Sequence, residues 1–232
     1  MTLIKNILRP IRNNTRNFLN YHIFSNYSQC GEDKLLAKLI NKKNGFYVDV
    51  GANDPIKLNN TYKFYKMGWK GINIDPIRKN IKELNRIRPR DINLEIGIND
   101  IKGEMELYVF DNTALSTFSS DLAKSWEKDG FKIDEVIKVK LVRLEDVFKK
   151  YKCNQIDLLS IDAEGFDLQV LKSNNWNKFK PNFICLETGD LKSKSGQKNR
   201  KEFINFLNPL GYEIIGDTGM NVVFKLIDNS IQ

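Results

Sequence analysis

FYVDVGAND, residues 46–54, joins a short apolar run to a loop of small and polar residues. From residue 28 onward this design recurs, because short apolar runs alternate with segments of helical periodicity. Such alternation is typical of β-α-β units, in which parallel strands form one sheet and helices cover both of its faces. The sequence therefore predicts an α/β fold with a doubly wound, mostly parallel sheet.

The order of the predicted elements follows from the apolar runs. The runs over residues 156–162 and 182–187 are almost wholly apolar, which indicates strands buried on both faces. Apolar runs on either side of residues 217–219 predict a C-terminal antiparallel hairpin. A second antiparallel excursion is expected from residue 103 to 110, followed by a polar loop over 111–121 and, much later, a mobile basic loop over 192–201. The other predicted strands are residues 46–50, 71–75, 92–98 and 136–142, with helices over 61–67, 76–87 and 144–151.

Composition limits the class of protein. The 232 residues are 41% hydrophobic and 28% charged, enough to bury the core of one domain. No run approaches the roughly 18 to 20 apolar residues of a membrane-spanning helix, and the N-terminus lacks the apolar block of a secretory signal. We therefore expect a cytoplasmic protein. Its net charge of +8 favours anionic partners without naming one.

Cysteine and histidine usage restricts the chemistry further. Cys30, Cys153 and Cys185 lie far apart and form no C-x-x-C pair, which argues against a disulfide framework or a zinc knuckle. The single histidine, His22, cannot build a two- or three-histidine metal site. Any general base is therefore expected to be a carboxylate.

The first nineteen residues contain four basic residues and no acidic one, with apolar residues at helical spacing. This pattern predicts a basic amphipathic helix, which Pro10 would interrupt. Two interpretations stay open: residues 1–20 attach the protein to the inner, anionic membrane surface, or they pack against the domain or a partner subunit. We assign residues 1–27 to an N-terminal extension and residues 28–232 to the domain.

Four predicted strands carry an acidic residue at, or one residue before, their C-terminal end. These residues are Asp49, Asp75, Asp162 and Glu187. Because the carboxyl ends of parallel strands share one edge, where ligands bind in open α/β sheets, the four acids are expected to converge on one crevice. A buried carboxylate needs a partner, and ribose hydroxyls, an ammonium or a sulfonium would supply one. The alternative is that each acid caps the helix that follows it.

The loop after the first predicted strand contains one glycine, Gly51. Nicotinamide and flavin dinucleotide sites favour G-x-G-x-x-G, because a pyrophosphate must approach the backbone closely at several positions. A nucleoside without a pyrophosphate needs only one such approach, and Asp75 would accept hydrogen bonds from its ribose hydroxyls. S-adenosylmethionine satisfies these terms, whereas no phosphate loop or kinase signature supports ATP.

Seven short motifs follow one another along the chain: SQCGED (28–33), GFYVDVGAN (45–53), NNTY (59–62), GWKGINIDP (68–76), LSTFS (115–119), LSIDAEG (159–165) and FICLE (183–187). Together they resemble the FkbM family of methyltransferases over about residues 28–225. The resemblance implies a class I, Rossmann-like methyltransferase fold that uses S-adenosylmethionine. It also implies methylation of a hydroxyl, often on a sugar or a polyketide-like product, and we predict that the acceptor is a sugar, glycan or glycolipid precursor.

The same resemblance implies where the cofactor binds. Its methionine moiety would lie against the loop after the first strand, and its ribose at the end of the second. Relatives more often carry Glu at the ribose position, where this chain has the shorter Asp75. The residues implied around S-adenosylmethionine are Asp49, Gly51, Asn53, Asn60, Thr61, Asp75, Pro76 and Asp162.

Methyl transfer from a sulfonium requires that the acceptor hydroxyl be held in line and lose its proton. Asp162 and Glu164 are our candidates for acceptor orientation and proton removal. The alternative is that Asp162 binds the cofactor's amino group and Glu164 caps the helix that begins near Phe166. A Mg²⁺ ion held by these two residues and Glu187 is a further alternative. No ligand spacing in the sequence demands one, so we predict no metal.

Two other functions stay open. Methylation of RNA or another nucleic acid is compatible with the positive charge, but the chain has no recognised RNA-binding module and no N-P-P-Y motif, so no nucleic-acid partner is expected. A non-catalytic, membrane-peripheral module that only binds S-adenosylmethionine is the second. The intact set of acids argues against it.

Overall fold

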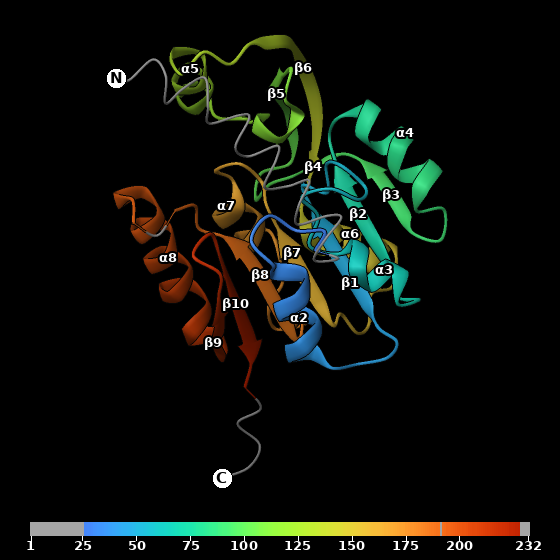
Figure 1. Ribbon diagram of the computed structural model, residues 1–232. Coiled ribbons are helices and arrows are strands. Elements are labelled where there is room, and N and C mark those ends of the chain that lie inside the picture. The colour runs from blue at the N-terminus through green and yellow to red at the C-terminus, as the bar shows by residue number, and fades with distance from the viewer. Residues whose placement is uncertain (1–25, 191, 228–232) are drawn as a thin grey trace.

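The computed structural model describes residues 26–190 and 192–227, so the predicted N-terminal helix and His22 lie outside the described residues. The described chain forms two sheets (Figure 1). The larger has the strand order β3-β2-β1-β7-β8-β10-β9, and the smaller has the order β4-β6-β5. The strands of the larger sheet are β1 (Phe46–Val50), β2 (Lys70–Asp75), β3 (Ile92–Glu95), β7 (Leu158–Ile161), β8 (Phe183–Glu187), β9 (Tyr212–Asp217) and β10 (Asn221–Leu226).

Strand directions in the larger sheet confirm the predicted architecture. All neighbours from β3 through β8 run parallel. β10 lies between β8 and β9 and runs antiparallel to both. It forms the C-terminal hairpin with β9. The predicted doubly wound, mostly parallel α/β sheet with an antiparallel C-terminal hairpin is therefore present.

Helices cover both faces of this sheet because successive side chains of a strand point to opposite faces. On one face Tyr47 packs with residues of α2 (Glu32–Ile40) and α3 (Tyr62–Lys66). On the other face Val48 packs with residues of α6 (Leu144–Lys150), α7 (Asp167–Lys172) and α8 (Lys194–Leu207). Figure 1 shows α2 in front of the sheet. β7 is buried along its whole length, which explains its nearly uninterrupted apolar sequence.

The predicted strand over residues 92–98 is wrong as a single element. β3 ends at Glu95, and after Ile96 the residues Gly97–Ile98 form β4 of the smaller sheet, parallel to β6 (Ile133–Val142). A Cβ at Gly97 would lie 2.6 Å from Leu141 Cδ2, so a larger residue here would displace packed side chains of the smaller sheet. The remaining strand, β5 (Gly103–Phe110), pairs antiparallel with β6, as expected.

Two predicted loops contain helices. The basic segment 192–201 was expected to be a mobile loop, but α8 begins at Lys194, where the Ser193 hydroxyl accepts a hydrogen bond from the Gly196 N–H at 3.0 Å. The apolar residues that hold α8 on the sheet, Phe203 and Leu207, come only in its second half. Within the predicted polar loop 111–121, a 3₁₀ turn (Thr113–Leu115) precedes α5 (Ser120–Lys128).

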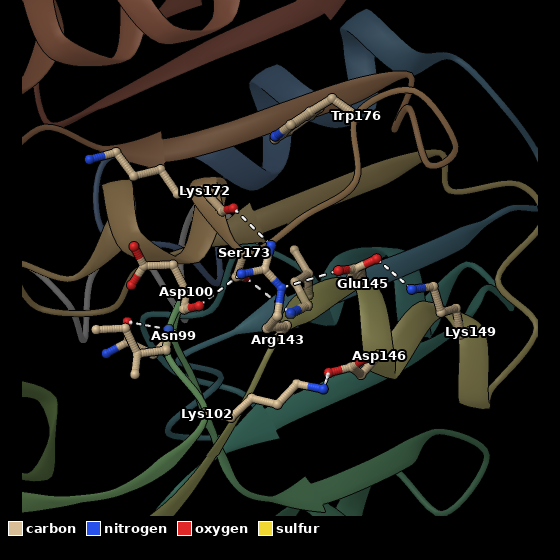
Figure 2. A network of polar contacts seen from close by, with 12 residues as sticks. Asn99, Asp100, Lys102, Arg143, Glu145, Asp146, Lys149, Lys172, Ser173 and Trp176 are labelled. Carbon is tan, nitrogen blue, oxygen red and sulfur yellow. Dashed lines mark hydrogen bonds and ion pairs between the residues drawn. The ribbon is translucent and has the colours of Figure 1, made fainter.

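Arg143 connects the smaller sheet to the helices behind the larger one (Figure 2). It follows β6, and its guanidinium donates to the Asp100 carbonyl at 2.8 Å, to Glu145 Oε1 at 3.1 Å and to the Lys172 carbonyl at 3.4 Å. The N–H of the next residue donates to Ser173 Oγ at 3.0 Å. One side chain thus joins the turn after β4, the start of α6 and the end of α7.

The helix α4 (Arg78–Ile87) lies along β2 and β3 and buries Ile81 and Leu84. Its last turn leads into a fully buried residue, Arg88, which reaches the loop after β1. Within the described parts of the chain, every helix is too short or too polar to span a bilayer.

Candidate functional site

The carboxyl ends of four adjacent parallel strands bring the four predicted acids to one edge of the larger sheet. Asp49 lies next to last in β1, Asp75 ends β2, Asp162 follows β7 and Glu187 ends β8. Asp49 is close enough to Asp75 and Asp162 to raise the pKa of both carboxyls. The convergence expected from the strand pattern is therefore observed.

Three carboxylates form the centre of this edge. One oxygen from each of Asp162, Glu164 and Glu187 lies within 4.8 Å of the others. Asp162 Oδ1 is buried and has no hydrogen-bond partner among the described residues. We call these three residues the acidic triad.

Burial and mutual repulsion make the acidic triad hard to ionise. Burial, and then the charge of Glu187, raise the pKa of Asp162 well above its usual range. Burial, followed by the charges of Asp162 and Asp167, does the same for Glu164. Burial and the nearby Glu164 raise the pKa of Glu187 to about 7. Burial therefore favours the protonated forms of these carboxyls, and a cation bound among them would favour the ionised forms.

A tight turn fixes the position of Glu164. Its backbone is left-handed, with φ 44°, and Gly165 follows with φ 93°. Thr117 Oγ1 donates to the Glu164 carbonyl at 2.8 Å, and buried Asp167 accepts from the Ala163 N–H at 3.3 Å. Asp167, at the first position of α7, thus stabilises the backbone of this turn.

Gly51 packs against the same turn. With φ 82°, it places its Cα so that an added Cβ would lie 1.8 Å from the Asp162 carbonyl oxygen. The close backbone approach that the sequence suggested for a nucleoside is therefore made here by the protein's own chain. A role for Gly51 in cofactor binding stays a prediction.

Asp75 organises the loop after β1. Its Oδ2 accepts from the Asn53 N–H at 2.9 Å, and its Oδ1 accepts from the Ile77 N–H at 2.8 Å and from Asn80 Nδ2 at 3.2 Å. Burial raises the pKa of Asp75 to about 6. A carboxylate offers about four acceptor positions, so one remains for a ribose hydroxyl. Pro76 is half-buried and precedes the first residue of α4 by two positions.

Asn53 lies between the two loops that border this edge. Its backbone is left-handed, with φ 44°, and its Oδ1 accepts from Asn80 Nδ2 at 3.1 Å and from Thr113 Oγ1 at 2.9 Å. Thr113 belongs to the segment between β5 and β6. The predicted cofactor loop is thus held to the smaller sheet as well as to Asp75.

Asp49 and Thr61 form one buried pair. Thr61 Oγ1 donates to Asp49 Oδ2 at 2.7 Å, and Thr61 has no exposed surface. Asn60 is half-buried, and its Nδ2 donates to Ser160 Oγ at 3.4 Å. Asn60 therefore lies where a ligand can reach it, whereas Thr61 acts on the site through Asp49.

Arg88 completes this pair and was not among the predicted site residues. Its Nη1 donates to Thr61 Oγ1 at 2.9 Å. Arg88 stands among other basic residues just before Pro89. The sequence therefore does not distinguish it from an exposed arginine at the end of a helix. Only the packing of α4 against the loop after β1 brings it to the site.

A comparison with protein families gives one match. The family model described as the methyltransferase FkbM domain matches residues 49–214, well over half of the 232 residues. The matched range includes every residue that was predicted to bind a cofactor or to act in catalysis. No curated protein matches the chain.

Solved structures of several methyltransferases resemble the chain distantly. A putative rRNA methylase from Clostridium thermocellum has 10% identity and a TM-score of 0.45, covering 84% of this chain and 96% of that one. A putative O-methyltransferase from Klebsiella pneumoniae has 13% identity and a TM-score of 0.43, covering 96% and 90%. A 1,6-didemethyltoxoflavin N1-methyltransferase from Burkholderia thailandensis, with bound S-adenosylhomocysteine, has 9% identity and a TM-score of 0.45, covering 92% and 85%. At such scores these likenesses say nothing about the acceptor of this chain.

Proposed function

The chain belongs to the FkbM methyltransferase family, and on that premise we propose that it transfers a methyl group from S-adenosylmethionine to a hydroxyl of a sugar, glycan or glycolipid precursor. The match over residues 49–214 carries this proposal. The α/β fold is the one expected of a class I methyltransferase, and the acids at its carboxyl edge lie inside the matched range.

The residues at this edge suit the chemistry of S-adenosylmethionine. When bound, this cofactor supplies an electrophilic methyl group on a cationic sulfonium and also carries an ammonium. Carboxylates are the side chains that pair with such cations, and Asp162 Oδ1 is buried without a partner of its own. Asp75 retains an acceptor position for a ribose hydroxyl. Asp49, Asp75 and Asp162 are therefore the residues that would hold the cofactor.

The acidic triad also suits proton removal from an acceptor hydroxyl. An ordinary carboxylate, with a pKa near 4, is a weak base, and burial raises the pKa of Glu164 above that range. With the cationic cofactor bound, which would favour the ionised form of the triad, Glu164 would take the hydroxyl proton as the C–O bond forms and the C–S bond breaks. Asp162 orients the same hydroxyl. The tight turn at residues 162–165 holds both side chains in place.

The acceptor class is tested by incubating the full chain with methyl-labelled S-adenosylmethionine and separate fractions of carbohydrate, glycolipid and RNA. Label is expected in the carbohydrate or glycolipid fraction, in a linkage that survives mild alkali because an ether, unlike an ester, is not hydrolysed. Label that appears only in RNA would overturn the proposed acceptor. Absence of binding to S-adenosylmethionine and S-adenosylhomocysteine in calorimetry would overturn the proposed activity itself.

A further inference from the structure

Arg88 is a fully buried arginine whose guanidinium joins three segments near the carboxyl edge of the larger sheet. Its Nε donates to the Pro55 carbonyl at 2.8 Å. Its Nη1 donates to Thr61 Oγ1 at 2.9 Å and to Asn73 Oδ1 at 3.1 Å, and its Nη2 donates to Asn59 Oδ1 at 2.6 Å. The guanidinium thus connects the end of α4, the loop between β1 and α3, and β2.

The charge of Arg88 is balanced through a hydroxyl. Thr61 Oγ1 accepts from Arg88 and donates to Asp49 Oδ2 at 2.7 Å, so this hydroxyl bridges a buried cation and a buried anion. The other titratable groups that the charge of Asp49 affects are all acidic: Asp75 on β2, Asp162 after β7, Tyr47 on β1 and Cys185 on β8. Arg88 opposes their repulsion, because its charge lowers the pKa of Asp49 while burial raises it.

Arg88 also acts on the loop that borders the site. Asn59 Oδ1, which accepts from Arg88, accepts as well from the N–H groups of Thr61 at 2.9 Å and Tyr62 at 2.8 Å at the start of α3. Asn59 Nδ2 donates to the Ala52 carbonyl at 3.0 Å and to the Asp54 carbonyl at 3.1 Å. These carbonyls flank Asn53, so Asn59 links the guanidinium to the backbone on both sides of Asn53 in the predicted cofactor loop.

We propose that Arg88 is a positioning residue for the methyl-donor site: through Asn59 and Thr61 it holds residues 51–61 and the Asp49 carboxylate in the geometry that binds the donor. This inference rests on the proposed function, because it takes the donor to be S-adenosylmethionine. Arg88 has no exposed surface, so it acts on the donor only through these neighbours.

The test compares Arg88→Met and Arg88→Lys with the wild type and with Arg86→Ala. Arg86 lies in the last turn of α4, two residues before Arg88, is exposed and forms an ion pair with Glu83, so its removal controls for the loss of a positive charge at this end of the helix. Arg88→Met is expected to raise the KM and the Kd for S-adenosylmethionine at least tenfold. Its kcat at saturating donor and its KM for the acceptor should change less than threefold. Arg88→Lys, which keeps the charge but not the fork of donors, should lie between.

A pH series separates this role from general support of the fold. In Arg88→Met the Asp49 carboxylate loses the cation that lowers its pKa, so it takes up a proton at a higher pH. As the pH is lowered, binding of S-adenosylmethionine should therefore begin to weaken at a higher pH than in the wild type. Circular dichroism checks folding. If Arg88→Met does not fold, Thr61→Val removes the bridging hydroxyl while Arg88 keeps its bonds to Pro55, Asn59 and Asn73, and the same rise in donor KM is expected.

Two results would overturn the inference. One is a folded Arg88→Met variant that binds S-adenosylmethionine with the Kd and the pH dependence of the wild type. If Arg88→Met does not fold, the same result in a folded Thr61→Val variant would overturn the inference. The other is a fall in kcat with an unchanged donor KM. If the wild type binds the donor and a variant shows either result, only the positioning role fails. If the wild type binds neither S-adenosylmethionine nor S-adenosylhomocysteine, the proposed function fails and this inference with it.

Discussion

Gly51 lies so close to the Asp162 carbonyl that a Cβ at residue 51 would come within 1.8 Å of that oxygen. The loop after β1 and the turn after β7 therefore depend on each other. Gly51→Ala must separate them and also strain a left-handed backbone, so we expect a loss of about 3 kcal/mol or more in unfolding free energy, together with loss of donor binding. Urea denaturation and calorimetry measure both.

Gly219→Ala is the matched control for this substitution. Gly219 has a similar backbone, with φ 86°, but an added Cβ there meets nothing within 4 Å. Its cost should be the backbone strain alone, about 1–2 kcal/mol, with donor binding retained. Equal losses in the two variants would show that the contact with Asp162 has no energetic consequence.

Glu164→Gln keeps the size of the side chain and removes its ability to take a proton. If Glu164 is the base, kcat should fall roughly 10²- to 10³-fold while the Kd for S-adenosylmethionine changes little. The exposed Glu83→Gln is the control. Steady-state kinetics with a saturating donor make the measurement, and a Glu164→Gln variant with wild-type kcat would remove this residue from the catalytic pair.

Glu187 should make the ligand-free protein less stable as the pH rises. Its pKa in the fold, about 7, lies above the ordinary value of 4.5, so the folded state binds the proton more tightly than the unfolded state does. The resulting stability is fully present below about pH 4.5 and is lost as the pH rises through about 7. Between pH 5 and 8, the Tm of Glu187→Gln should therefore fall less with rising pH than the Tm of the wild type. A steeper loss in the variant would contradict the assignment.

Arg143→Ala should loosen the junction between the two sheets. The substitution removes hydrogen bonds to the carbonyls of Asp100 and Lys172 and the contact with Glu145, so the unfolding free energy should fall by about 1–3 kcal/mol. Arg86→Ala, whose ion pair is exposed, should leave the unfolding free energy almost unchanged. Equal effects in urea denaturation would mean that Arg143 does not hold the junction.

Removal of residues 1–20 tests the proposed membrane contact of the basic N-terminal extension. We expect the shortened protein to lose binding to vesicles of phosphatidylglycerol and phosphatidylcholine, and to retain methyl transfer to a soluble acceptor. Co-sedimentation and the labelling assay measure the two properties. Unchanged vesicle binding would exclude this contact, and a loss of methyl transfer would indicate that the extension takes part in the site.

The strands were predictable from the sequence where burial is the main determinant. β1 and β8 are short apolar runs that end in or near an acid, and their bounds match the prediction to within one residue. The run over 92–98 was predicted as one strand because both halves are apolar. Gly97 instead pairs with Leu141 of the smaller sheet, which is 44 residues away and invisible in a local pattern.

The same distinction applies to the candidate site. Asp49, Asp75, Asp162 and Glu187 could be grouped because strand ends in a parallel sheet share an edge. The role of Arg88 could not, because it depends on bonds to Pro55, Asn59 and Thr61, which lie 27 to 33 residues away. Likewise, the fact that Asp75 orders the Asn53 backbone depends on the fold of a loop for which the sequence offers no periodicity.

The smaller sheet begins and finishes at one place on the larger one. β4 and the last residues of β6 are paired, with Gly97 opposite Leu141 and Ile98 opposite Val142, so the roughly forty residues between them form a closed excursion. A segment whose two ends meet can be lengthened, shortened or exchanged without reordering the strands that carry the acids. Within this excursion, only changes that spare Thr113 and Thr117 would leave the proposed donor site undisturbed, because their hydroxyls bond to Asn53 and to the Glu164 carbonyl.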